Sequence, residues 1–185
     1  ARLWRELAPK LDRDIGLQQT GVTYLAGSDA KMPGYADWLP HAKANGVDSR
    51  LMDAGEVAAA FPGLSKSYAG ALVTPSDMRA EPWVAVPALA ALAAKEGVRI
   101  IENCAVRKLD LAAGRVAGVV TEAGAIRTTS VVLAGGAWSA LFLRAHGVSL
   151  PQLSVRESVL ATNVLPEVHA GAAAEAGLAF RRRAD

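Results

Sequence analysis

Residues 130–139 read SVVLAGGAWS, and this stretch decides how the middle of the chain folds. The four apolar residues at 131–134 predict a short buried strand of the kind found in parallel sheets. Gly135 and Gly136 follow, and residues 137–145 predict a helix. A ligand can touch the backbone at a glycine because no side chain blocks its approach. The first N–H groups of a helix have no partner within the helix, so the turn suits an anionic ligand.

The segments before this turn predict a helix followed by a meander. Residues 83–96 are rich in Ala and Leu and are followed by Gly97, a suitable C-cap. Strands separated by turn residues are expected at residues 98–101, 105–111, 115–121 and 125–128. A meander that connects two parallel strands fits a doubly wound nucleotide-binding fold. We therefore expect an α/β protein that contains part of such a domain.

The segments outside this middle part predict a β-rich α+β layer. Leucines at a four-residue interval indicate a helix over residues 2–14. Pro9 lies inside this span, so a kink or a late start of the helix is the alternative. Asp53 and Glu56 are spaced as a capping box at the start of another helix. Strands of the layer are expected at residues 21–26, 70–74 and 156–164, with a further strand from Leu178.

The composition excludes several function classes. The 185 residues carry a net charge of only +2, so nucleic acid is not an expected partner. The single cysteine excludes an intrachain disulfide and a multi-cysteine metal site. There is no signal peptide and no apolar run of about 18 residues, so we expect a cytoplasmic protein without a membrane span. The first residue is not methionine and the last residues form no tail, so we expect an internal fragment of a longer chain.

Several short motifs follow one another at spacings that belong to one family. They are PGL at 62–64, PSD at 75–77, EP at 81–82, ALAALAAKEGV at 88–98, Val106, GVVT at 118–121, the turn at 131–139, LP at 150–151 and Arg156. Their order resembles the D-amino-acid oxidase-like family of FAD-dependent flavoproteins, which includes sarcosine and glycine oxidases.

This resemblance implies an FAD cofactor and a set of contacts to it. In the family, the residue equivalent to Val106 meets the adenine ring through its backbone. The turn equivalent to residues 134–136 packs against the flavin nucleotide. The implied cofactor residues are Ala105, Val106, Ala134, Gly135, Gly136 and Trp138. A plain tight turn is the alternative for the two glycines, and packing of the helix on the sheet is the alternative for Trp138.

The chain departs from the family in one respect. The Gly-x-Gly-x-x-Gly loop of the family is missing, because Gly34, Gly46 and Gly55 do not have its spacing. The resemblance also implies that a C-terminal segment with further flavin contacts lies outside the chain. Residues 1–80 are expected to be part of a substrate domain with a leading helix. Residues 81–147 would be a partial FAD-binding domain, and residues 148–185 would return to the substrate domain.

The resemblance further implies oxidation of an amino acid or an amine. A hydride would pass from the substrate α-carbon to the flavin, and water would hydrolyse the resulting imine. An arginine offers a two-pronged contact to a substrate carboxylate. The residues considered for this contact are Tyr24, Tyr68, Arg79, Arg156 and Arg182, for each of which a surface or structural role is the alternative. No catalytic acid or base is identified, and the three histidines do not have metal-ligand spacing.

Two other functions stay open from the sequence. One is a flavoprotein dehydrogenase that acts on a hydroxy compound with the same fold. The other is a non-enzymatic α/β module that binds a ligand or a partner, which the missing glycine-rich loop favours. A homo-oligomer is also left open.

Overall fold

The computed structural model describes residues 2–183 and divides into two compact units. The first unit comprises Ala1–Val98 and Thr162–Asp185, and the second comprises Arg99–Ala161. The division expected from the sequence, at residues 81 and 148, concerns function and stays a prediction.

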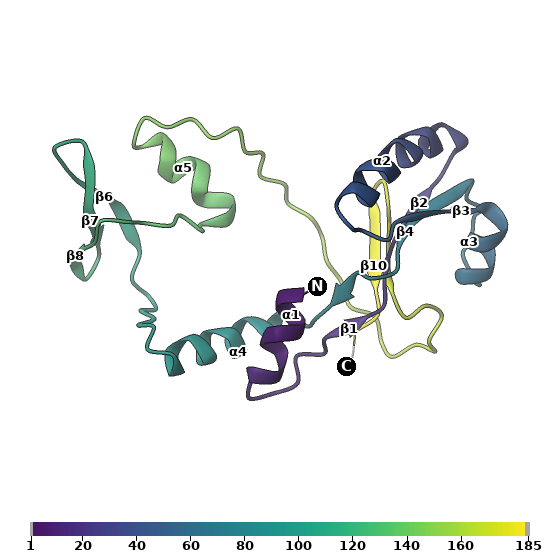
Figure 1. Cartoon of the computed structure of the whole chain (residues 1–185), viewed down its shortest axis with the longest axis horizontal. Coiled ribbons are helices and arrows are strands. Elements are labelled where there is room, and N and C mark those ends of the chain that lie inside the picture. Colours follow the sequence, from purple (N-terminus) through teal and green to yellow (C-terminus); the bar gives the residue numbers. More distant parts are fainter. Residues whose placement is uncertain (1, 184–185) are drawn as a thin grey trace. The chain divides into compact units, whose positions relative to one another are not determined.

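A five-stranded sheet organises the first unit, with the strand order β10-β9-β2-β4-β3 (Figure 1). Its strands are β2 (Val22–Ala26), β3 (Arg50–Asp53), β4 (Gly70–Thr74), β9 (Ala172–Glu175) and β10 (Leu178–Arg181). Strands β2 and β9 pair in parallel, whereas the other neighbours are antiparallel. The last part of the chain therefore completes a sheet that the first part begins.

The main core of this unit lies on one face of the sheet. Leu25, Ala71 and Met52 are register neighbours on three adjacent strands, so their side chains point to the same face. Val57 and Phe61 cover them, and all five are buried. They come from helix α3 (Ala54–Ala60) and the residue that follows it.

Three helices of the first unit begin within one residue of the position that the sequence predicts. Helix α3 has the expected capping box, in which Asp53 and Glu56 each accept a hydrogen bond from the other residue's backbone N–H. Helix α4 (Pro82–Lys95) contains Pro87 in its interior. The leading helix is shorter than expected, because α1 (Arg2–Leu7) changes to 3-10 geometry near Pro9. The remaining elements are η1 (Ala8–Lys10), β1 (Gln18–Gln19), η2 (Asp29–Lys31), α2 (Met32–Ala44) and β5 (Met78–Arg79).

A second, smaller cluster joins α4 to the N-terminal segment. Ile15, Ala85 and Ala88 are buried together, and Trp4 and Leu11 pack against them. Through this cluster, helix α4 is packed as a part of the first unit.

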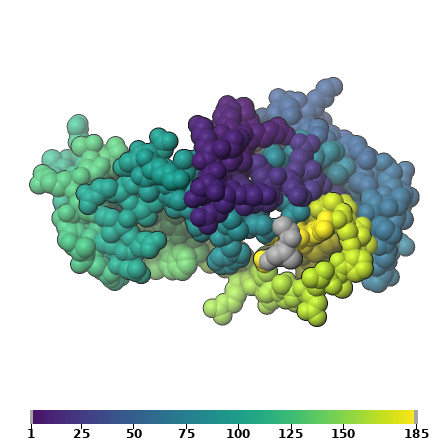
Figure 2. Space-filling view, turned by 90° about the horizontal axis from the view of Figure 1, so that it is seen from below, coloured from purple at the N-terminus to yellow at the C-terminus, as the bar shows by residue number. Residues whose placement is uncertain are grey.

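The C-terminal segment belongs to the same unit. In the space-filling view it is yellow and lies against other segments of this unit (Figure 2).

The second unit contains the meander expected from the sequence. Strands β6 (Val106–Ala112), β7 (Arg115–Thr121) and β8 (Gly124–Arg127) form an antiparallel sheet in this order. The helix after the two glycines is also present, as the 3-10 turn η3 (Gly136–Trp138) and helix α5 (Ser139–Arg144).

Three predicted strands are wrong. Residues 98–101, 131–134 and 156–164 are not part of any strand. A strand needs a neighbour to hydrogen-bond its backbone, and within residues 2–183 no strand pairs with these segments. Val132 accordingly has 90% of its surface exposed. Strands β9 and β10, rather than residues 156–164, complete the β-rich layer.

Candidate functional site

The outer edge of β6 presents backbone groups at Val106. The Ala105 carbonyl accepts a hydrogen bond from the Glu122 N–H at 3.2 Å, and Val106 is the register partner of Thr121. In this antiparallel pattern the N–H and C=O of Val106 point away from β7. Strand β6 is an edge strand of the described sheet, so both groups face an open edge. One donor and one acceptor are therefore offered side by side.

The two glycines of the turn differ in what surrounds them. Gly136 has a φ of +52°, and a Cβ added there would meet no atom within 4 Å. A Cβ on Gly135 would lie 3.3 Å from Ser139 Oγ and 3.4 Å from Leu133 Cδ1. The open side of the turn is thus at Gly136, whereas Gly135 allows the helix that follows it and the segment that precedes it to approach closely.

A histidine holds the helix of the turn against the meander. His146 Nε2 accepts a hydrogen bond from the Leu109 N–H of β6 at 2.9 Å. His146 Nδ1 lies 2.9 Å from the Phe142 carbonyl of α5. Since Nε2 is the acceptor, Nδ1 carries the proton and donates it to Phe142. No local sequence signal points to this contact, because Leu109 lies 37 residues before His146 in the chain.

All six predicted cofactor residues lie in the second unit. Ala105 precedes the edge strand and Val106 begins it, and Ala134, Gly135 and Gly136 form the turn. Trp138 is 73% exposed, so packing does not explain its position.

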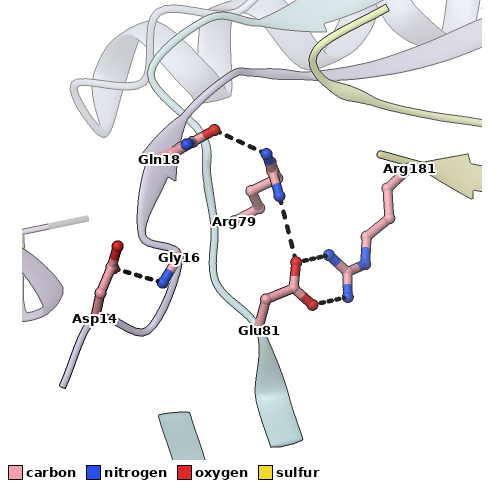
Figure 3. A network of polar contacts seen from close by, with 6 residues as sticks. All are labelled: Asp14, Gly16, Gln18, Arg79, Glu81 and Arg181. Atoms are coloured by element: carbon pink, nitrogen blue, oxygen red, sulfur yellow. Dashed lines mark hydrogen bonds and ion pairs between the residues drawn. The ribbon is translucent and has the colours of Figure 1, made fainter. Parts of the chain in front are cut away.

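Four polar residues form a partly buried network in the first unit (Figure 3). Arg181 Nη1 and Nη2 each donate to a carboxylate oxygen of Glu81 at 2.9 Å. Arg79 Nη1 donates to Glu81 at 3.3 Å, and Arg79 Nη2 donates to Gln18 at 2.7 Å. The Arg79 side chain is only 8% exposed. Among the described residues, its Nε is buried without a hydrogen-bond partner. The network joins β1, β5, the start of α4 and β10. Holding these elements together is a structural role that accounts for the buried Arg79 side chain.

Comparison with known proteins identifies the family of this chain. A family model described as FAD dependent oxidoreductase matches residues 1–184. The chain belongs to the family of FAD-dependent oxidoreductases. This oxidoreductase chain is 29% identical to the mitochondrial sarcosine dehydrogenase of Homo sapiens over 164 residues, 85% of the chain. It is 31% identical to a D-amino acid dehydrogenase of Bradyrhizobium diazoefficiens over 159 residues, 82% of the chain.

A solved structure has the same fold as the oxidoreductase chain. The L-amino acid deaminase of Proteus myxofaciens, in complex with anthranilate, matches 97% of the chain with a TM-score of 0.78 and 29% identity. The match covers 42% of that deaminase, and the chain covers 18% of the human and 38% of the bacterial dehydrogenase. The chain thus spans less than half the length of these relatives.

The other predicted substrate residues of the oxidoreductase lie apart from the Arg79 network. Tyr24 on β2 is exposed, Arg156 is exposed in the second unit, and Arg182 forms an ion pair with Glu167. Tyr68 is buried, and the Lys66 ammonium lies 5.1 Å from the centroid of its ring.

Tyr68 and Lys66 line a groove of about 540 Å³ beside α3. Lys66 Nζ also lies 2.7 Å from Glu175 Oε1, and this hydrogen bond lowers the pKa of the Glu175 carboxyl below its ordinary value. The ammonium of Lys66 therefore already has a carboxylate partner.

None of the described helices is long and apolar enough to cross a membrane. Within residues 2–183 of the oxidoreductase, no three His, Cys, Asp or Glu side chains are grouped so that they could hold a metal ion.

Proposed function

We propose that the second unit forms one side of an FAD site in an enzyme that oxidises an amino acid or an amine. The observation that carries this proposal is the open edge at Val106, in a chain of an FAD-dependent family. The cofactor residues of the proposal are Ala105, Val106, Ala134, Gly135, Gly136 and Trp138.

The backbone at Val106 suits an adenine ring. Adenine offers an amino donor and ring-nitrogen acceptors, which complement the C=O and N–H that point away from β7. Because this recognition uses backbone groups, the side chain needs only to be apolar, and Val106 is 44% exposed. The residues present therefore fit the adenine end of FAD.

The turn at Gly136 suits close approach of the nucleotide. Its open side has no atom within 4 Å of an added Cβ, and its positive φ favours glycine. Bound FAD would supply the acceptor for the electron pair that leaves the substrate. This chain would bind and orient the cofactor, and its arginines would orient a substrate carboxylate.

The amino-acid substrate class is proposed from the names of the relatives. Sarcosine dehydrogenase, D-amino acid dehydrogenase and L-amino acid deaminase all carry an amino acid in their names. The residues proposed for the substrate carboxylate remain Tyr24, Tyr68, Arg79, Arg156 and Arg182. The bonds of Arg79 to Glu81 and Gln18 give it a structural role beside this proposed one.

FAD binding to the purified protein tests the cofactor site directly. In Gly136→Asn the positive φ is tolerated, because asparagine adopts this conformation more readily than other residues with a side chain. The new side chain fills the open side of the turn, so we expect FAD binding to be lost while the fold is kept. Gly46→Asn is the matched control, since Gly46 has a φ of +66° and equally open space. FAD affinity that is equal in both variants would refute the proposed position of the cofactor.

Turnover of an amino acid and of a hydroxy acid tests the substrate class. Flavin reduction is the measured signal for both compounds. Reduction by the amino acid alone is expected. Reduction by the hydroxy acid alone would instead favour a dehydrogenase of a hydroxy compound.

A cytoplasmic location and a homo-oligomeric state remain predictions. Cell fractionation can test the location, and the mass in solution can test the oligomeric state.

A further inference from the structure

One glutamine side chain closes the turn of the proposed FAD site. Gln152 Nε2 donates a hydrogen bond to the Gly136 carbonyl at 2.9 Å. Gln152 Oε1 accepts a hydrogen bond from the Ala140 N–H at 3.0 Å. Only one orientation of the carboxamide satisfies both partners, because the carbonyl requires a donor and the N–H requires an acceptor. The two bonds span the whole start of the helix, from residue 136 to residue 140.

The helix that carries the turn has few other supports. Helix α5 has six residues, and none of them is buried. Isolated helices of this length are not stable in water, so side-chain hydrogen bonds must hold it. His146 fixes its C-terminal end to β6, and Gln152 fixes its N-terminal end.

The bond to Gly136 also fixes the direction of one peptide group. The Gly136 carbonyl accepts hydrogen bonds from Ser139 N–H and from Gln152. The peptide is planar and trans, so the N–H of Ala137 points opposite to this carbonyl. A glycine with positive φ has several other conformations available, and both bonds reduce the freedom of the turn.

We propose that Gln152 is a positioning residue for FAD, which holds the Gly136 turn in the conformation that receives the nucleotide. This inference rests on the proposed function. When only a fraction of the molecules has the turn in its competent conformation, the apparent dissociation constant of the ligand increases by the inverse of that fraction. Loss of two exposed hydrogen bonds corresponds to roughly a five-fold loss of affinity.

Two substitutions in the purified protein distinguish the effects of the two Gln152 hydrogen bonds. Gln152→Met keeps the length of the side chain and loses both bonds. Gln152→Glu keeps an acceptor for Ala140 and places a carboxylate against the Gly136 carbonyl. FAD titration of the apoprotein, its melting temperature without FAD and hydrogen exchange of the Ala140 amide are measured. Leu153→Ala is the control, because its side chain is 86% exposed and lies next to Gln152 in sequence.

Gln152→Met is expected to bind FAD roughly five-fold more weakly. Gln152→Glu loses only the bond to Gly136 and should bind FAD more weakly than wild type by a smaller factor. The apoprotein melting temperature of both variants should stay close to that of wild type and of the control. The Ala140 amide should exchange faster in Gln152→Met and remain protected in Gln152→Glu. A role in stability alone would lower the melting temperature and leave FAD affinity unchanged, and this result overturns the inference. If the wild-type protein binds no FAD, the proposed function itself fails and the inference fails with it.

Discussion

Glu81 is the residue on which the largest polar network of the first unit depends. It precedes a proline at the start of α4, and its side chain is 10% exposed. Two guanidinium groups, of Arg79 and Arg181, bind the same carboxylate. The sequence points to Glu81 only through the EP motif at 81–82, because its partner in β10 lies 100 residues away.

Removal of this carboxylate should destabilise the first unit. We expect Glu81→Gln to lower the free energy of unfolding by about 2–3 kcal/mol. This lies below the cost for a fully buried pair, because 32% of the Arg181 side chain is exposed. Urea unfolding followed by tryptophan fluorescence measures the change. Glu6→Gln, which removes an exposed ion pair with Arg2, should cost less than about 0.5 kcal/mol. Equal losses in both variants would contradict this assignment.

A second residue-scale prediction concerns His169 and pH. Its ring lies 4.1 Å from the ring of Phe61, and burial lowers the pKa of His169 below its ordinary value. As pH falls through about 6.5, the unfolded state takes up the proton before the folded state does. The contribution of neutral His169 to the free energy of unfolding is therefore fully present above this pH, and it decreases below it.

The variant His169→Phe keeps an aromatic ring beside Phe61 and cannot titrate. The loss of unfolding free energy between pH 7.5 and pH 5.5 should be smaller in this variant than in wild type. His41→Gln, at an exposed position of α2, should retain the wild-type pH dependence. A profile of His169→Phe that is parallel to that of wild type would exclude the burial effect.

At the scale of elements, local signals predict helices better than strands. The capping box at Asp53 and the turns of the meander are set by neighbouring residues, and the structure has them. The strand at residues 131–134 was predicted from apolar residues alone and is wrong, because apolar character does not supply a hydrogen-bonding neighbour.

Strand β9 shows the opposite failure. Its sequence at Ala172–Glu175 consists of residues that are uncommon in strands, so propensity gives no signal. It is a strand because it pairs in parallel with β2, about 150 residues earlier in the chain. The site follows the same rule. The turn at the two glycines was predicted from local sequence as a structural feature, and the structure has it. The contacts of Gln152 and His146 reach over 12 to 37 residues and were not predicted.

The capping box makes a prediction at this scale. Asp53→Ala leaves the Glu56 N–H without its acceptor at the start of α3. We expect a loss of about 1 kcal/mol in unfolding free energy, measured by urea unfolding. Asp53→Asn keeps a side-chain oxygen as acceptor and should lose less than half of this amount. If the alanine and asparagine variants are equally stable, the cap does not support α3.

At the scale of the whole molecule, cofactor function and compact packing divide the chain differently. Helix α4 was assigned to the FAD-binding part from its place in the family pattern. It packs on Ile15 in the first unit, and the second unit begins only at Arg99. The residue at which the FAD-binding part begins therefore remains a prediction. Hydrogen exchange of individual amides, measured with and without FAD, can test it.

FAD should stabilise the second unit selectively, because all six proposed contacts lie within Arg99–Ala161. At a free concentration 100 times its dissociation constant, a ligand that binds only the native state contributes about 2.7 kcal/mol. Hydrogen exchange with and without FAD measures this effect for each amide. We expect slower exchange in β6, β7 and α5 and unchanged exchange in β2, β3 and β4. Adenosine alone should slow exchange at the β6 edge and leave the Gly136 turn unaffected, since it lacks the pyrophosphate and the flavin. FAD-dependent protection confined to the five-stranded sheet would place the cofactor in the first unit and refute the assignment of Val106 and Gly136.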